Sequence, residues 1–346
     1  MARAKRKTED PDLFANDSRG GSNYTAQDIE VLEGLEPVRR RPGMYIGGTD
    51  DGALHHLAAE ILDNAMDEAV AGHADRIAMH LGVDGALAIT DNGRGIPIDP
   101  HPKFKSKSAL EVILTTLHSG GKFDGKVYQT SGGLHGVGLS VVNALAATLK
   151  VEVARDKQLW AQEYAQGKPK GKLKKIKAVN NRRGTTVTFL PDPEIFGKNA
   201  AFAGARLFEM AKSKAYLFRG VEIRWSCDPS LIAADSGVPT RETFHFPGGL
   251  KDYLDVTLGA EHRVTSQIFA GRTEKLTGHG AVEWAVSWTA DDGFVQPEEG
   301  NKKIAYLIDM QTVRILDLVT GITLADNQAE LAKERAGSVA GEPLTS

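Results

Sequence analysis

The residue types best suited to chemistry lie in a short turn at residues 91–97, whose sequence is DNGRGIP. The carboxylate of Asp91 ends an apolar run, and Gly93 and Gly95 let the backbone bend sharply after it. Such a turn lets backbone and side-chain groups approach a flat ligand closely. The same residues by themselves also favour an ordinary hairpin turn, so the flanking sequence has to decide between the two interpretations.

A row of oxygen-bearing side chains precedes the turn, within a helix predicted at residues 55–72. Glu60, Asn64, Asp67 and Glu68 fall on one arc, at helical spacings of i, i+4, i+7 and i+8. No Lys or Arg stands among them to pair with the carboxylates. Magnesium prefers oxygen ligands and keeps several waters, so the row favours a divalent cation site, although a solvated helix face is the ordinary alternative.

A glycine-rich segment follows the turn, from Gly120 to Gly138, and leads into an apolar helix predicted at residues 140–147. Backbone N–H groups at a glycine-rich helix N-terminus bind phosphate. The segment is not a Walker A loop, because GxxxxGK[ST] is missing, and it does not follow a first strand as a Rossmann turn does. A phosphate-binding loop and a flexible connection are the two interpretations.

The helices and strands that position these residues are predicted from the periodicity of apolar residues and from the turn-forming residues between them. Strands at 76–81 and 86–90 form a predicted hairpin, and the second strand leads into Asp91. A lysine-rich stretch at 168–177 and a proline-containing basic stretch at 35–47 are predicted to be loops, and residues 24–33 a helix. Further predicted helices cover 109–117 and 202–217, and further predicted strands cover 150–154, 160–164, 184–189 and 221–225.

A second α/β unit is predicted after a polar stretch near residues 226–242. It contains a loop and helix at 244–258 and strands at 263–270 and 281–289, and a hairpin formed by 304–309 and 312–318 is predicted in the tail that follows. The predicted domains are a disordered basic tail at 1–22, a first domain at 23–235, a second domain at 236–296 and a tail at 297–346.

Composition excludes several classes of protein. The chain has 346 residues and a net charge of −3, so it is not a polycation, and any DNA contact has to be local or lie on a partner. The single Cys227 excludes an intramolecular disulfide and a cysteine-rich zinc site. No apolar run reaches the roughly 20 residues that cross a bilayer, and the basic N-terminus is not a secretory signal.

Five linked motifs together resemble one family. The chain is similar to the ATPase subunit of bacterial type IIA topoisomerases, and the sequence LEPV with KAYL at 214–217 is more similar to the ATPase subunit of topoisomerase IV than to that of gyrase. The resemblance covers about residues 24–296. The motifs are LEPVRRRPGMYIG at 35–47, EILDN at 60–64, DNGRGIP at 91–97, LHSGGKF at 117–123 and SGGLHGVG at 131–138.

The resemblance implies an α+β fold. The first domain is expected to be a Bergerat-type (GHKL) ATPase α/β sandwich with a mixed, mostly antiparallel sheet. A truncated, transducer-like α/β domain of the ribosomal S5 type is expected to follow.

The resemblance also implies roles for individual residues. Glu60 corresponds to the general base that deprotonates the attacking water, Asn64 to the Mg²⁺ ligand, and Asp91 to the acceptor of the adenine amino group. Tyr24 belongs to an arm that reaches a second copy of the chain, and Tyr128 is expected near the nucleotide. The other expected ATP contacts are Arg94, Gly95, Ile96, Pro97, Gly120, Gly121, Lys122, Gly133, Leu134, His135, Gly136, Val137, Gly138 and Thr185.

The implied function is ATP-driven closure of a dimer gate during DNA strand passage, with ATP and Mg²⁺ as cofactors. The implied partners are a second copy bound through the N-terminal arm, a cleavage subunit of the topoisomerase IV type, and DNA, in the bacterial cytoplasm near the nucleoid and away from any membrane. This chain is not expected to relax DNA alone. The alternative is an ATP-dependent dimerisation module that does not hydrolyse ATP. Histidine kinases, Hsp90-type chaperones and mismatch-repair clamps do not explain the basic stretch at 35–47.

The sequence departs from the family at about Pro297. The family's loop with a lysine for the γ-phosphate is not recognisable there, and the predicted hairpin at 304–318 resembles part of a WD-type propeller blade. One blade cannot bury its own faces. A fused foreign tail, a divergent pair of strands from the second domain, and an error in the gene model are the three interpretations.

Overall fold

A computed structural model describes residues 32–119, 136–233, 235–258, 266–274, 281–289 and 302–309. The predicted tail at 1–22, residues 24–31 of the helix predicted at 24–33, and the predicted strand at 312–318 lie outside these residues. Within the described residues, no helix has the length and apolar character that a membrane crossing requires.

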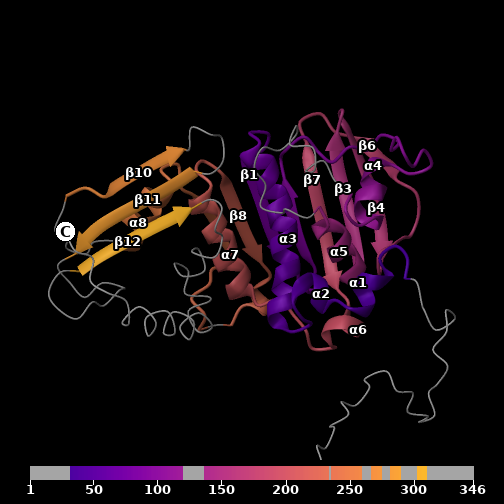
Figure 1. The fold of residues 1–346 in the computed structure, drawn as a ribbon, viewed down its shortest axis with the longest axis horizontal. Coiled ribbons are helices and arrows are strands. Elements are labelled where there is room, and N and C mark those ends of the chain that lie inside the picture. Colours follow the sequence, from indigo (N-terminus) through magenta and orange to yellow (C-terminus); the bar gives the residue numbers. More distant parts are fainter. Residues whose placement is uncertain are drawn as a thin grey trace, which may run out of the picture. The chain divides into compact units, whose positions relative to one another are not determined.

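A nine-stranded sheet forms the centre of the larger part of the chain (Figure 1). Its order is β5-β4-β3-β7-β2-β1-β8-β9, with β6 also paired to β4. The described pairings are antiparallel except that of β1 with β8, so the sheet is mixed and mostly antiparallel, as expected. The strands are β1 (Arg76–Leu81), β2 (Leu87–Asp91), β3 (Ala146–Arg155), β4 (Gln158–Ala165), β5 (Lys168–Pro169), β6 (Lys174–Ala178), β7 (Gly184–Pro191), β8 (Glu222–Cys227) and β9 (Arg241–His245).

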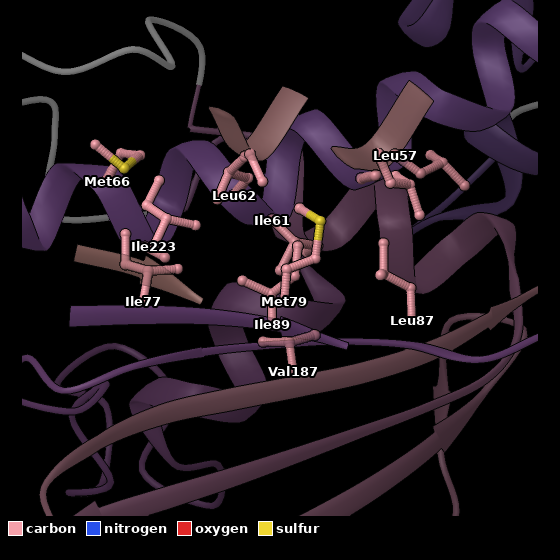
Figure 2. Close-up of a cluster of buried hydrophobic side chains, with 14 of the residues drawn as sticks. Leu57, Ile61, Leu62, Met66, Ile77, Met79, Leu87, Ile89, Val187 and Ile223 are labelled. Carbon is pink, nitrogen blue, oxygen red and sulfur yellow. The ribbon is translucent and has the colours of Figure 1, made fainter. Parts of the chain in front are cut away.

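The helix that carries the acidic row packs on one face of this sheet (Figures 1 and 2). This is α3 (Asp51–Val70), which begins where the Asp50 carboxylate accepts a 2.9 Å hydrogen bond from the Ala53 amide. Its apolar stripe, including Ile61 and Leu62, is buried in one core with the inward side chains of β1 and β2. The alternation of buried and partly exposed residues along β2 places Ala88 and Thr90 on the other sheet face.

Most predicted elements of the first domain are present with shifted ends. The hairpin of β1 and β2 is confirmed, and α4 (Ala109–Thr115) and α7 (Gly204–Leu217) lie within the predicted helices. The helix predicted at 140–147 is α5 (Gly138–Leu145), and β3 begins directly after it at Ala146. A short helix that was not predicted, α6 (Pro193–Phe196), and a 3-10 turn (Pro229–Leu231) complete the first part.

The predicted loop at residues 35–47 is wrong in detail. It contains two short helices, α1 (Glu36–Arg40) and α2 (Gly43–Ile46). Proline breaks helix interiors but is tolerated in the first turn, where its missing N–H is not needed, and Pro37 occupies such a position. The left-handed Gly47 ends α2.

The predicted loop at residues 168–177 is also wrong. This stretch forms β5 and β6, which pair with β4 at the edge of the sheet. Lysines are common on edge strands because their charge discourages pairing with other chains, so a high lysine content does not exclude a strand.

A separate three-stranded antiparallel sheet contains β10 (Phe269–Glu274), β11 (Ala281–Thr289) and β12 (Lys302–Asp309). Helix α8 (Leu250–Leu258) packs against β11. The first of these strands lies later than the predicted strand at 263–270, and β12 pairs with β11 along its whole length. Because β12 pairs with β11, residues 304–309 match the interpretation in which they form a divergent strand of the second unit.

The nine-stranded sheet continues beyond residue 235, the predicted end of the first domain. Strand β9 pairs with β8 from Glu222 opposite His245 to Ser226 opposite Arg241. Strand β9 therefore belongs to the first sheet, although it follows the predicted boundary. The division into domains stays a prediction.

Candidate functional site

The turn after Asp91 is attached to the start of β1 by Asn92. The Asn92 side-chain oxygen accepts hydrogen bonds from the backbone amides of Asp75 and Arg76, both at 3.0 Å. Its amide nitrogen donates to the Asp75 carboxylate at 2.6 Å. This side chain therefore fixes where the turn leaves the sheet.

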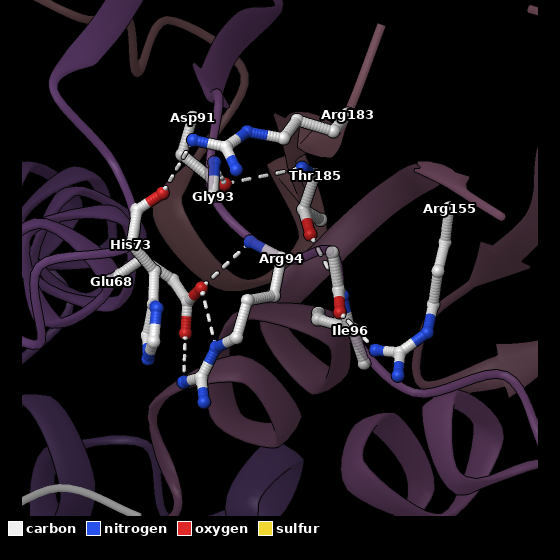
Figure 3. Close-up of polar contacts among 10 residues, drawn as sticks. Glu68, His73, Asp91, Gly93, Arg94, Ile96, Arg155, Arg183 and Thr185 are labelled. Carbon is white, nitrogen blue, oxygen red and sulfur yellow. Dashed lines mark hydrogen bonds and ion pairs between the residues drawn. The ribbon is translucent and has the colours of Figure 1, made fainter. Parts of the chain in front are cut away.

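Glu68 on α3 holds the other side of the turn (Figure 3). Its two carboxylate oxygens accept hydrogen bonds from Arg94, at 2.7 Å from Nη2, 3.2 Å from Nε and 2.9 Å from the backbone amide. A methyl group at residue 93 would collide with the Glu68 carboxylate, so only glycine fits there. Arg94 is thus fixed by an ion pair whose Glu68 side chain is only 13% exposed.

The predicted four-residue metal row is corrected by these contacts. Glu68 is occupied with Arg94, and the Asp67 side chain is buried, so neither belongs to an open metal site. The described residues contain no group of three or more His, Cys, Asp or Glu side chains arranged to hold a metal. Glu60 and Asn64, one turn apart and both partly exposed, are the oxygen donors of the row that remain.

Asp91 is a buried acid at the end of β2. It is 7% exposed, and burial raises its pKa to about 6 in spite of the hydrogen bonds it accepts. Its Oδ1 accepts from the amides of Gly93 at 2.8 Å and Thr185 at 3.3 Å. The Thr185 hydroxyl accepts from the Ile96 amide at 3.1 Å, so Asp91, Thr185 and the turn form one connected group (Figure 3).

The backbone on the far side of the turn is close to two strands. Gly95 has φ +78°, and a Cβ there would lie 3.1 Å from Val153 and 3.2 Å from the Ala154 carbonyl oxygen. Arg155 donates to the Gly95 carbonyl oxygen at 3.0 Å. The turn, the end of β3 and the loop before β7 border a cavity of about 810 Å³ that Asp91, Arg94 and Arg155 help to line.

Glu60 lies at the other end of the same face of α3. A methyl group on Gly138, the first residue of α5, would collide with the Glu60 carboxylate. His56 Nε2 lies 3.3 Å from Glu60 Oε1, and this hydrogen bond raises the pKa of His56. The Asn64 amide nitrogen donates to the Glu60 carbonyl oxygen at 2.7 Å.

The start of α5 presents backbone donors beside Glu60. Val137 precedes the helix and provides no side-chain cap, and Gly136 is left-handed at φ +60°. The first amides of a helix have no partner within it, and together with the helix dipole they attract anions. A carboxylate next to such amides can orient a water towards a phosphate that binds there.

The structure brings together Glu60, Asn64, Asp91, Arg94, Gly95, Ile96, Thr185 and the Gly136 to Gly138 part of the glycine segment, with Pro97 on the same turn. The predicted contacts Tyr24, Gly120, Gly121, Lys122, Tyr128, Gly133, Leu134 and His135 lie outside the described residues.

Sequence reasoning missed three residues of the site. His56 was recognisable from its i, i+4 spacing to Glu60, which places the two on one helix face. Arg155 and Gly184 carried no such signal, because only strand pairing brings them to the turn. At Gly184 the backbone passes so close to Asp91 that a side chain would collide with it.

Comparisons with known proteins identify the family. Residues 49–195 match the family described as histidine kinase-, DNA gyrase B-, and HSP90-like ATPase. The B-subunit of DNA topoisomerase 4 from Bartonella bacilliformis is 58% identical over 275 residues, which cover 80% of this chain and 40% of that protein. The Caulobacter vibrioides protein of the same name is 58% identical over 278 residues, covering 79% of this chain and 40% of its own length.

A solved structure supports the same relationship. The 43K ATPase domain of Thermus thermophilus gyrase B, crystallised with an aminocoumarin, is 37% identical with a TM-score of 0.63, over 74% of this chain and 63% of that one. The chain spans about 40% of the length of the curated relatives it matches. Its first domain therefore has the GHKL ATPase fold, whose type of site binds ATP. The chain belongs to the family of bacterial type IIA topoisomerase ATPase subunits and corresponds to their N-terminal part.

Proposed function

We propose that this chain is the ATP-hydrolysing part of the ATPase subunit of a topoisomerase IV-like enzyme. The observation that carries the proposal is the layout of α3. Glu68 lies at the buried Asp91 end and Glu60 at the Gly138 end, eight residues apart, which is about 12 Å along a helix. This separation suits a nucleotide whose base binds at Asp91 and whose phosphates reach the start of α5.

Each end of the site has a chemical task under this proposal. The Asp91 carboxylate accepts a hydrogen bond from the adenine amino group, and the close backbone of the turn contacts the base. Glu60 acts as general base towards the attacking water, and His56, 3.3 Å away, positions the Glu60 carboxylate. The amides from Gly136 to Gly138 neutralise charge on the phosphates.

Asn64 is the side chain proposed to hold Mg²⁺. Magnesium is usually bound by one or two protein oxygens together with substrate phosphates and waters, so a single amide oxygen beside Glu60 fits the ion. When bound, Mg²⁺ supplies positive charge that offsets the charge of the phosphates.

The role of the whole protein is part of the proposal, because the chain spans less than half of its relatives. ATP closes a dimer gate around a DNA segment, and hydrolysis reopens it. A second copy joins through the N-terminal arm that contains Tyr24, and a cleavage subunit of the topoisomerase IV type cuts the DNA. We expect the protein to work in the bacterial cytoplasm.

Steady-state ATP turnover, with nucleotide affinity measured by calorimetry, tests the proposal. Glu60→Gln keeps the size of the side chain and removes the base, so turnover should fall about 100-fold or more while ATP still binds. Glu36→Gln, an exposed acid outside the site, is the matched control and should not change turnover. Equal turnover of parent and Glu60→Gln with tight ATP binding would instead support the non-hydrolysing dimerisation module.

A further inference from the structure

The charge of the chain is distributed unevenly. Residues 165–191 contain eight cations and no Asp or Glu, although the whole chain has a net charge of −3. Strand pairing places much of this segment on the edge of the nine-stranded sheet, as β5, β6 and the loop that leads into β7. The eight cations are Lys168, Lys170, Lys172, Lys174, Lys175, Lys177, Arg182 and Arg183.

Several of these cations share one sheet face. Lys174 pairs with Ala161 and Lys177 with Leu159, so both lie on the face of β4 opposite to Trp160 and Gln162. The pairings continue from Ala161 through Glu152 to Thr186.

The same face continues across the sheet. The Thr186 hydroxyl is 2.9 Å from that of Thr90, and Thr90 pairs with Ala78. This face is opposite to the buried face that packs on α3. It contains Lys174 and Lys177 at one edge and Arg76 on β1, with small or apolar side chains such as Ala78, Ala161 and Leu159 between them.

A cavity of about 810 Å³ extends along this face beyond the turn that holds Asp91. Arg182 and Arg183 line it and donate to neutral oxygens, the Thr186 hydroxyl at 3.2 Å and the His73 carbonyl at 3.1 Å. Lys157, on the hairpin between β3 and β4, lines it as well. No carboxylate within 4.0 Å of these three side chains is found in the described part of the chain.

The lining also excludes some ligands. Thr90, Ala78 and the side-chain amides of Asn180 and Asn181 are polar or small, and no aromatic side chain lines the cavity among the residues described. Single-stranded nucleic acids are usually held by stacking on aromatic side chains, so a base has no platform here. The arginine and lysine side chains along this face can instead donate hydrogen bonds to phosphate oxygens.

Several acids near these cations are paired, but the exposed Glu163, two residues after Ala161 on β4, lies on the same face. Glu222 contacts Arg76 at 3.0 Å and Arg224 at 2.7 Å, and Glu152 contacts Lys150 at 3.6 Å. Asp156, whose side chain is 80% exposed, lies 3.6 Å from Arg155.

We propose that this face is a contact surface for the phosphate backbone of double-stranded DNA. The basic surface is defined by Arg76, Lys157, Lys174, Lys177, Arg182 and Arg183. Duplex DNA carries one negative charge per about 1.7 Å of axis, and its phosphates can bind several cations of the basic surface at once. Such binding does not require aromatic side chains, because the bases stay stacked within the duplex. The choice of DNA rests on the proposed function, but the surface is separate from Glu60 and its chemistry.

The test is fluorescence anisotropy of a short labelled DNA duplex with the full chain, without ATP, across about 50–200 mM salt. The variant Lys174→Gln/Lys177→Gln removes two cations for which the described part of the structure gives no hydrogen bond or ion pair, so it should fold normally. Its binding should be weaker, and the slope of log affinity against log salt should be smaller by about 1.8. Arg182→Gln/Arg183→Gln should act in the same direction, with its fold checked by thermal melting.

A matched control carries the same change of charge elsewhere. Lys198→Gln/Lys251→Gln alters two exposed lysines outside the basic surface and should leave the slope unchanged. Equal slopes for the parent and Lys174→Gln/Lys177→Gln would overturn the proposal, as would an equal loss in the control. Binding of inorganic tripolyphosphate measured by calorimetry that depends on Arg182 and Arg183, with no binding of the duplex, would show a small-anion site instead and also overturn it.

The two proposals fail separately. ATP turnover without DNA should be the same in Lys174→Gln/Lys177→Gln as in the parent, because neither lysine contacts the nucleotide site. Glu60→Gln should lose turnover and bind the duplex with the slope of the parent. If turnover does not depend on Glu60 while duplex binding depends on the two lysines, only the proposed function fails.

Discussion

Asp91 has two properties that link its chemistry to pH. It is buried, and its pKa is raised to about 6 because burial penalises the charged carboxylate. Only the ionised carboxylate is purely an acceptor, which is the form that an adenine amino group requires. The proposed nucleotide site therefore contains a carboxyl group whose pKa is raised to about 6.

ATP affinity should fall as the pH falls below about 6. Protonated Asp91 loses acceptor capacity, so affinity should decrease by up to about tenfold per pH unit in the acid range. Calorimetry between pH 5 and 8 measures this. Asp91→Asn should bind ATP far more weakly at every pH and retain only the pH dependence of the ATP phosphates. A parent and variant with the same affinities would remove Asp91 from adenine recognition.

Glu68→Ala should loosen the turn that contains Arg94. The variant removes three hydrogen bonds from a mostly buried carboxylate and should lower the free energy of unfolding by about 1–3 kcal/mol. ATP affinity should fall with it, since the same turn carries Gly95 and Ile96. Glu36→Ala breaks an exposed i, i+4 pair with Arg40 and should cost about 0.5 kcal/mol or less. Chemical denaturation distinguishes the two, and equal costs would contradict the anchoring role.

At the scale of elements, α3 and α5 meet at a single tight contact. Gly138→Ala introduces a methyl group where the Glu60 carboxylate lies, but the backbone there allows alanine and the carboxylate can rotate away. Stability should stay within about 1 kcal/mol of the parent, because alanine favours a helix. ATP turnover should fall because Glu60 is displaced. Gly171→Ala, which has open space around it, is the control, and unchanged turnover in both would contradict the contact.

His55 joins the start of α3 to the start of α7. Its Nδ1 donates to the Asp51 carbonyl oxygen at 2.7 Å, and its Nε2 accepts from the Ala203 amide at 3.0 Å, so the neutral ring is the form that fits. Burial lowers the pKa of His55 below its ordinary value. The unfolded chain therefore binds a proton that the folded chain does not, at pH values between the two pKa values.

Stability from His55 should be complete above pH 6.5 and decrease as the pH falls through its depressed folded-state pKa. Thermal melts of the parent and of His55→Gln from pH 5 to 8 measure this contribution as the difference between their melting temperatures. The difference should be largest at neutral pH and shrink towards acid pH. A difference that does not vary with pH would show that His55 acts through packing alone.

At the scale of the molecule, the described residues of the proposed nucleotide site lie in the first sheet and its helices, between His56 and Thr185. Strand β12 pairs instead with β11 of the smaller sheet. A chain that ends at Gln296 should therefore bind ATP as the full chain does. It should associate more, because β11 becomes an edge strand. Calorimetry and light scattering test this, and a loss of ATP binding would show that the last fifty residues support the site.

The sequence by itself was enough to predict candidate site residues where their placement depends on local order. Glu60 and Asn64 are one helical turn apart, and the glycines around Asp91 and before α5 mark close backbone approaches, so their roles followed from spacing and resemblance. The hairpin of β1 and β2 and the helix α3 followed from period and turn residues. Local propensity and binary pattern decide such features without distant partners.

Only the tertiary structure decided which side chains meet across strands. It assigned Glu68 to Arg94 and not to a metal, brought Arg155 and Gly184 to the turn, and turned a lysine-rich stretch into the edge strands β5 and β6. Strand order and register join residues about 90 positions apart, such as Asp91 and Thr185. Period along one strand holds no information on its neighbour, because pairing depends on which buried faces pack together.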